Sequence, residues 1–169
     1  MSRIREMRRR CERLVQTLDI PKVSEIRALC DVVARRRQRP IELLPITFSD
    51  GSLCGLWIAT DVGDYLAYEQ NTSAVHQEHI VLHELGHLLC GHNENGSFTA
   101  ELFRHFEPEI ALGALGRTNY STVEEREAEL VASILRQHCG LYGEATASAD
   151  SDLDRRLQFM FGHQPAAGE

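Results

Sequence analysis

Residues 80–90 constrain the fold more than any other part of the chain, because they place ionisable side chains inside an apolar run. They read Ile-Val-Leu-His-Glu-Leu-Gly-His-Leu-Leu-Cys. Apart from His83, Glu84, Gly86 and His87, every residue in this segment is apolar. A helix with this pattern has no solvent face, so the segment is predicted to be a buried core helix. Burying His83, Glu84 and His87 in such a helix is costly unless they are paired or bind a metal ion.

The spacing of the two histidines indicates a metal ion. Residues four apart lie one above the other on a helix, so His83 and His87 would present two imidazoles to the same point. A glutamate directly after the first histidine completes the H-E-x-x-H pattern, in which two histidines bind zinc and the glutamate acts as general base. The sequence therefore predicts a Zn²⁺ site with His83 and His87 as ligands and Glu84 as catalytic base. A surface helix with two unrelated histidines would not need the apolar flanks.

A catalytic zinc site needs a third protein ligand, and the acidic run at residues 124–129 is the place to look for it. This run begins a helix on which Glu127 shares a face with Val131 and Ile134, so Glu127 is the predicted ligand. Acidity in a first helical turn also complements the helix dipole, but that does not account for a glutamate on the apolar face. The other acids are Glu124, the second candidate, and two expected to face solvent, Glu125 and Glu129.

Peptide hydrolysis also needs a donor for the developing oxyanion. Tyr120 is preferred because it lies just before the ligand helix, and the other candidates are His105 and His138. His79 lies one turn before His83, but ligands at i, i+4 and i+8 would spread over ~12 Å, so a supporting or packing role is expected. The remaining histidines, His76 and His92, are interpreted as ordinary polar residues.

Periodicity predicts the elements around this helix. Apolar residues at three- and four-residue steps predict amphipathic helices over residues 3–18 and 21–37. Short apolar, β-branched segments predict three strands forming a small antiparallel meander, 41–48, 53–60 and 65–69. A substrate peptide could add to the strand at 65–69 as a further strand. A helix is expected from Ser121 or Thr122 to about His138, and shorter ones at 100–106 and 150–161.

Composition is that of one ordinary globular domain, since 43% of the 169 residues are hydrophobic and 25% are charged. We expect a single domain over 1–169, with a basic helical part at 1–40, the sheet and catalytic helices at 41–162, and a tail at 163–169. No apolar run reaches membrane-spanning length, and no apolar segment follows the basic N-terminus. The 5 cysteines are scattered, which favours a reducing compartment. The expectation is a cytoplasmic protein without a membrane partner.

Charge is divided unevenly along the chain. Residues 1–40 hold 12 Lys/Arg against 5 Asp/Glu, a net of +7, whereas residues 41–169 hold 6 against 20, a net of −14. Charges on helices usually face water, which is the favoured interpretation of the basic part. Direct nucleic-acid binding through this part is the less favoured alternative.

Several of these features together define a resemblance. A short sheet, His83-Glu84-Leu85-Gly86-His87, a following Gly91-His92, and Glu125-x-Glu127-Ala128-x-x-x-Ala132 resemble the ImmA/IrrE-type metallopeptidases over about residues 20–139. The resemblance implies an α+β, zincin-like fold, in which N-terminal helices and a small antiparallel sheet pack on the active-site helix and a C-terminal ligand helix. It implies the ligands and base already predicted, with Glu127 as third ligand. One departure is Glu129, where that pattern usually has Asn or Asp.

The resemblance also implies a substrate. Peptidases of this type typically cleave a helix-turn-helix transcriptional repressor, which relieves repression of a stress-response or mobile-element operon. The predicted function is therefore a site-specific, zinc-dependent endopeptidase acting on a regulatory protein. Two alternatives remain open: a non-catalytic regulatory module with the same fold that binds a repressor or DNA through its basic helices, and a toxin-like partner in a two-gene stress module.

Overall fold

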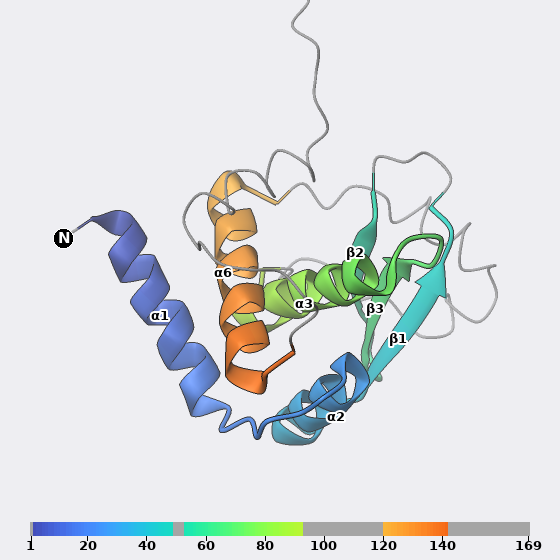
Figure 1. Cartoon of the computed structure of the whole chain (residues 1–169), viewed down its shortest axis with the longest axis horizontal. Coiled ribbons are helices and arrows are strands. Elements are labelled where there is room, and N and C mark those ends of the chain that lie inside the picture. Colours follow the sequence, from blue (N-terminus) through green and yellow to red (C-terminus); the bar gives the residue numbers. More distant parts are fainter. Residues whose placement is uncertain (1, 49–52, 93–119, 142–169) are drawn as a thin grey trace, which may run out of the picture.

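The computed structural model describes residues 2–48, 53–92 and 120–141 (Figure 1). The described residues form an α+β arrangement of four helices and three strands, and the α+β class agrees with the prediction. The elements are α1 (Arg3–Thr17), α2 (Ile26–Arg37), β1 (Ile41–Ile46), β2 (Gly55–Ala59), β3 (Asp64–Glu69), α3 (Ala74–Cys90) and α6 (Thr122–Cys139). The helices expected at 100–106 and 150–161, the tail, and His105 lie outside the described residues.

The sheet is mixed, with strand order β1-β3-β2. β2 pairs with β3 as an antiparallel hairpin, with Gly55 opposite Tyr68. β1 pairs with the other edge of β3 in parallel, with Ile41 beside Asp64. The predicted antiparallel meander is therefore wrong. β3 is central and has a neighbour on each side, so the expected addition of a peptide to this strand is wrong as well.

A buried ion cluster explains the parallel pairing. Asp64 begins β3, and its Oδ2 accepts hydrogen bonds from Arg37 Nη1 and Arg39 Nε, each at 2.9 Å. Its backbone N–H donates to the carbonyl of Pro40 at 2.9 Å. Its Oδ1 accepts from the Trp57 indole at 3.0 Å. These contacts hold the start of β1 beside the start of β3, so the two strands run in the same direction.

Helix α3 lies at the centre of the described structure, and its residues 80–88 are all buried, as predicted for a core helix. It contacts β2, β3 and α2, and it packs most extensively on α6, whose other side receives α1. Figure 1 shows α6 between α1 and α3. The two helices approach closely at Gly86, where an added Cβ would come within 2.5 Å of the Ala128 carbonyl oxygen.

Capping residues set the bounds of the two central helices. The Ser73 side chain accepts from the His76 backbone N–H at the start of α3. Ser121 and Glu124 form a reciprocal capping box at the start of α6, as the sequence predicts. Helix α2 begins at Ile26 rather than at Pro21. The preceding linker is held instead against the end of α6, because Ile20 is buried and its carbonyl accepts from His138 Nε2 at 2.8 Å.

Candidate metal centre

The two histidines of the H-E-x-x-H motif face each other inside the protein. His83 and His87 are 3% and 1% exposed, and their Nε2 atoms lie 3.0 Å apart. Each comes from α3, one turn from the other, as the spacing predicts. Their lone-pair nitrogens therefore converge on one point.

A carboxylate from α6 completes this group. Glu125 Oε2 lies 3.0 Å from His83 Nε2 and 3.5 Å from His87 Nε2. The ligand atoms of His83, His87 and Glu125 all lie within 4.8 Å of one another, which makes them a candidate metal-binding group. Two imidazoles and one carboxylate are a common donor set for zinc, and three protein ligands leave a coordination position open.

Glu129 holds the first histidine from behind. It is fully buried, and its Oε2 lies 3.3 Å from His83 Nδ1 and 3.3 Å from His79 Nε2. A carboxylate on Nδ1 fixes the imidazole tautomer that leaves Nε2 free for a metal. His79 thus has the supporting place that was expected of it. Glu129, the position at which the sequence departs from the resemblance, supplies the carboxylate beside His83 Nδ1.

The prediction that Glu127 joins the two histidines is not what the structure shows. Glu127 is 8% exposed and faces His92, with Oε2 2.9 Å from His92 Nε2, while Oε1 forms an ion pair with Arg10. Glu124, the second candidate, is used in the capping box, where its Oε2 accepts from the Ser121 N–H at 2.7 Å. The expectation that Glu125 and Glu129 face solvent is also wrong.

The reason is that α6 is covered on two sides. The sequence predicts that the apolar face with Glu127 and Val131 points toward the histidines. Helix α6 instead meets α3 through the line of Glu125, Ala128 and Glu129, because residues three and four apart share a face and the Ala128 backbone lies against Gly86 of α3. The spacing of Glu125 and Glu129 by four residues was a usable signal, since both can reach the same side of α3.

Glu84 is also buried but lies toward the sheet. It is 6% exposed, and its Oε2 has no hydrogen-bond partner among the described residues. Strand β2 comes so close to it that a Cβ on Gly55 would lie 2.8 Å from Glu84 Oε1. Burial raises the pKa of Glu84, partly opposed by the charges of His83 and His87. A desolvated carboxyl with a free oxygen is suited to proton transfer.

Of the two candidate oxyanion donors among the described residues, Tyr120 lies beside the motif. Its ring stacks on His87 with centroids 3.7 Å apart and an interplanar angle of 14°. His138 instead binds the Ile20 carbonyl at the far end of α6. The His76 ring lies at the start of α3, where its Nδ1 is 2.9 Å from Thr72 Oγ1, which agrees with an ordinary polar role.

His92 was interpreted as an ordinary polar residue, but it lies directly against the site. Its Nδ1 is 2.9 Å from His87 Nδ1. Together with Cys90 and Glu127 it forms a second group whose ligand atoms lie within 4.8 Å of one another. Burial and the neighbouring His87 lower the pKa of His92 to about 4, so its ring is neutral. The Gly91-His92 step of the resemblance was the available signal.

The pKa values show that the metal-free group attracts a cation. Burial disfavours the charged form of His83, but hydrogen bonds to Glu125 and Glu129 outweigh it and raise the pKa to about 10. Burial likewise disfavours charge on Glu125, yet its hydrogen bonds to His83 and His87 lower its pKa to about 2. A proton is therefore held where the side chains of His83, His87 and Glu125 converge, and a metal ion would compete with this proton.

Comparison with known proteins adds nothing to this geometry, since no protein-family model, curated protein or solved structure matches the chain. The functional argument therefore rests on the residues of the site. Among the described residues, no helix combines the length and the apolar character needed to cross a bilayer.

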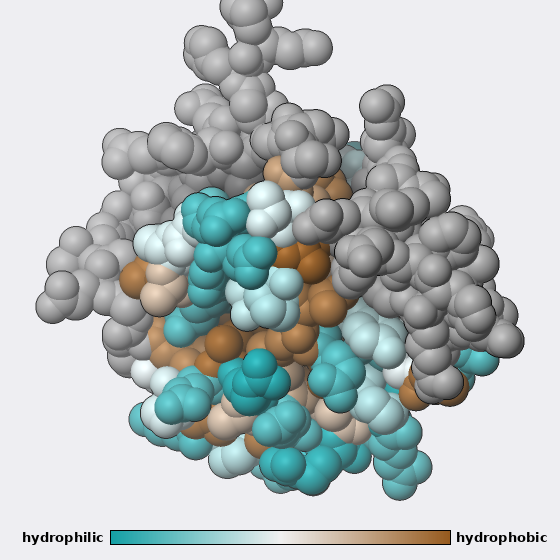
Figure 2. Space-filling model, turned by 90° about the vertical axis from the view of Figure 1, so that its right-hand side faces the viewer, coloured by the Kyte–Doolittle hydropathy of each residue, from teal (hydrophilic) through white to brown (hydrophobic). Residues whose placement is uncertain are grey.

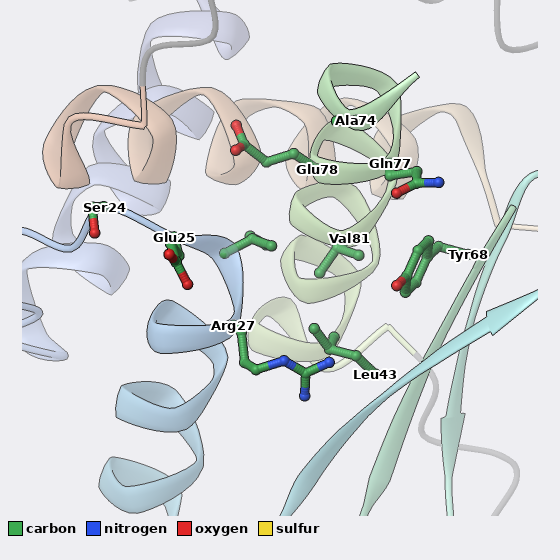
Figure 3. Close-up of a pocket in the computed structure, with 10 residues that line it drawn as sticks. Ser24, Glu25, Arg27, Leu43, Tyr68, Ala74, Gln77, Glu78 and Val81 are labelled. Atoms are coloured by element: carbon green, nitrogen blue, oxygen red, sulfur yellow. The ribbon is translucent and has the colours of Figure 1, made fainter. Parts of the chain in front are cut away.

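A separate hollow lies away from the histidines. Its volume is about 320 Å³, and it lies between the start of α2, the first half of α3 and the sheet (Figure 3). Leu43, Tyr68 and Val81 give it an apolar wall, while Glu25 and Arg27 border it. A space-filling view shows apolar surface gathered in the middle of one face and bordered by hydrophilic side chains (Figure 2). The hollow carries neither a histidine nor a cysteine, so it does not share the chemistry of the metal-binding group.

Proposed function

We propose that this chain is a zinc-dependent metallopeptidase with His83, His87 and Glu125 as ligands. The convergence of two imidazole nitrogens and one carboxylate within 4.8 Å is the observation that carries the proposal. The positions of the proposed ligands along the chain also fit a zinc peptidase. Two histidines lie on one helix, and the third ligand comes from a second helix packed on the first. A bound Zn²⁺ would act as a Lewis acid on the scissile carbonyl and lower the pKa of a water molecule to about 7.

The remaining chemistry falls to two other residues. Glu84 accepts a proton from the attacking water and passes it to the leaving amine, and the burial that raises its pKa brings that pKa closer to neutral pH. Tyr120, whose ring lies on His87, is the proposed hydrogen-bond donor to the developing oxyanion. Both residues already lie close to the histidines, so neither has to be brought in from another part of the fold.

The sheet suggests how a peptide is held. β2 is an edge strand, and it lies beside Glu84 at Gly55. An extended peptide can add to a sheet edge through main-chain hydrogen bonds, which would carry its scissile bond past the base. The resemblance to ImmA/IrrE-type peptidases favours a helix-turn-helix repressor as the protein that supplies this segment.

The proposal is tested by zinc analysis together with cleavage of a helix-turn-helix repressor encoded beside this gene, with denatured casein as the non-specific substrate. Glu84→Gln should keep the metal and lose on the order of 10²–10⁴-fold in kcat. Glu78→Gln, on the same helix but away from the ligands, should cleave at a rate within about twofold of the unaltered protein. If zinc-loaded Glu84→Gln cleaves as fast as the unaltered protein, Glu84 is not the base and the proposed mechanism fails.

The basic part supports a second candidate function, binding of DNA. Arg3, Arg5 and Arg13 are exposed on α1. Neutralising these three while keeping Arg10, which is committed to Glu127, tests this function without disturbing the metal-binding group. A DNA complex that weakens as salt rises and disappears in the triple variant would favour a regulatory module. Absence of any complex at low salt would remove this candidate.

A further inference from the structure

A continuous line of polar contacts runs from the N-terminal helix to the metal-binding group. Arg10 on α1 forms an ion pair with Glu127 Oε1 on α6. Glu127 Oε2 lies 2.9 Å from His92 Nε2, and His92 Nδ1 lies 2.9 Å from His87 Nδ1. Three segments far apart in sequence thus meet behind one histidine of the motif.

The donors and acceptors along this line can be assigned in one consistent direction. When His87 Nε2 faces a metal ion, its proton must sit on Nδ1, which donates to His92 Nδ1. His92 then carries its own proton on Nε2 and donates to Glu127 Oε2. Arg10 forms its ion pair with the remaining oxygen of Glu127. In this assignment each nitrogen of the two rings has a single role, and each oxygen of Glu127 has one partner.

We propose that His92, Glu127 and Arg10 are positioning residues that fix the tautomer and the direction of the His87 ring. This inference rests on the proposed role of His87 as a metal ligand. The partners that orient a ligating histidine are known to change metal affinity by about 10–100-fold. Through Arg10 the position of α1 contributes to the metal site, although no residue of α1 belongs to the metal-binding group.

The ring of His83 is oriented by a single residue instead of three. Glu129, fully buried, contacts His83 Nδ1 directly. The line behind His87 ends instead on a guanidinium whose side chain is 62% exposed. One histidine is therefore fixed within the core, and the other through a contact that depends on the docking of a surface helix.

The cluster of Cys90, His92 and Glu127 invites a different interpretation, a second metal site. The Arg10 guanidinium argues against it, because its ion pair with Glu127 already balances the charge of the one carboxylate in that cluster. The nitrogen of His92 that faces His87 is used as an acceptor in the assignment above. The metal stoichiometry distinguishes the two interpretations.

The experiment measures Co²⁺ affinity by chelator competition, with the visible spectrum of bound Co²⁺ as a report on ligand geometry. His92→Phe keeps a ring and removes both nitrogens, and it should weaken Co²⁺ binding by about 10–100-fold and alter the spectrum. His92→Gln can still accept and donate, and it should restore affinity to within about threefold of the unaltered protein. Arg10→Met should weaken binding by about tenfold, whereas Arg5→Met on the same helix should not.

Each outcome decides between the hypotheses. If the unaltered protein binds one Co²⁺ and both His92→Phe and Arg10→Met bind it equally tightly, the positioning role is wrong while the metal site stands. Two Co²⁺ ions per chain, one of them lost in His92→Phe, would replace this role by a second site. If the unaltered protein binds none, the proposed function fails together with the inference. Should His92→Phe unfold in circular dichroism, the exposed Arg10→Met decides alone.

Discussion

The two buried faces of α6 carry the same residue type in different chemical settings. On the face toward α3, Glu125 and Glu129 meet imidazoles, and within the described part of the chain neither forms an ion pair with an arginine. On the face toward α1, Glu127 meets His92 but also the guanidinium of Arg10. On the first face the carboxylates are balanced by a proton on the histidines, which a metal ion can displace, whereas on the second Glu127 is paired with a permanently charged guanidinium. A buried glutamate is therefore the better candidate ligand when its only cationic partner in the protein is one that can give up its proton.

The largest difference between the two faces is expected in the Zn²⁺ affinity of variants that replace one glutamate on each face. Glu125→Gln removes a proposed direct ligand and should lower Zn²⁺ affinity by more than about 100-fold, beyond the effect of losing an orienting partner. Glu127→Gln should cost about tenfold at most, because it disturbs only the contacts behind His87. Competition with a zinc chelator measures both. Equal losses would mean that the two faces do not differ in their relation to the metal.

A side chain added between α3 and α6 should disturb the face of α6 toward α3 and leave the face toward α1 in place. A Cβ at residue 86 would come within 2.5 Å of the Ala128 carbonyl oxygen, which is backbone and cannot turn aside. Gly86→Ala should therefore lower the free energy of unfolding by about 1–3 kcal/mol and move Glu125 away from the histidines. Urea unfolding of the metal-free protein gives the first effect and Zn²⁺ affinity the second. Unchanged values for both would show that the helices separate at no cost.

The stability contributed by the face of α6 toward α3 should depend on pH, because the pKa values of His83 and Glu125 are shifted in known directions. His83 has a pKa of about 10 in the folded protein, above its ordinary value of 6.5, so its contribution to stability is complete below 6.5 and is lost as pH rises through about 10. The pKa of Glu125, about 2 against 4.5, gives a contribution present above 4.5 and lost as pH falls toward 2.

The metal-free protein should thus lose stability between pH 7 and pH 10, while Zn²⁺ affinity should rise by up to about tenfold per pH unit as the proton leaves. Urea midpoints and chelator competition across this range measure the two trends. Glu125→Gln should flatten the alkaline loss of stability. A Zn²⁺ affinity independent of pH would contradict the picture of a proton held between the ligands.

The smallest expected effect belongs to neither face and serves as a baseline. Ser121→Ala removes one half of the capping box at the start of α6 and should cost about 1 kcal/mol of unfolding free energy. Zn²⁺ affinity should stay within about twofold, because the cap touches no ligand. A large loss of affinity would indicate that fraying of the first turn releases Glu125, which would extend the site to the helix end.

The part of the site that depends on local spacing was predictable. His83, Glu84 and His87 lie on one buried helix because four-residue spacing and apolar flanks specify that arrangement by themselves. The start of α6 at Ser121 was predictable for the same reason. The choice between Glu125 and Glu127 was not, because both lie on buried faces of α6, and the sequence does not say which face meets α3.

The order of the strands shows the same limit on a larger scale. Turn residues and alternating apolar positions indicated three strands, and three strands are present. Their order depends on Asp64, which draws Arg37 and Arg39 to the start of β3 and thereby sets β1 parallel to it. Such contacts join residues more than twenty positions apart, so no local pattern specifies them.

By itself the sequence determined a buried helix with two imidazoles one turn apart and a carboxylate between them, since helical periodicity is a property of neighbouring residues. Only the tertiary structure decided which acid of α6 meets those imidazoles, and that Arg10 neutralises the other. Both outcomes follow from how closely α6 packs on α3 at Gly86 and on which side α1 covers it, and packing of this kind is settled between elements.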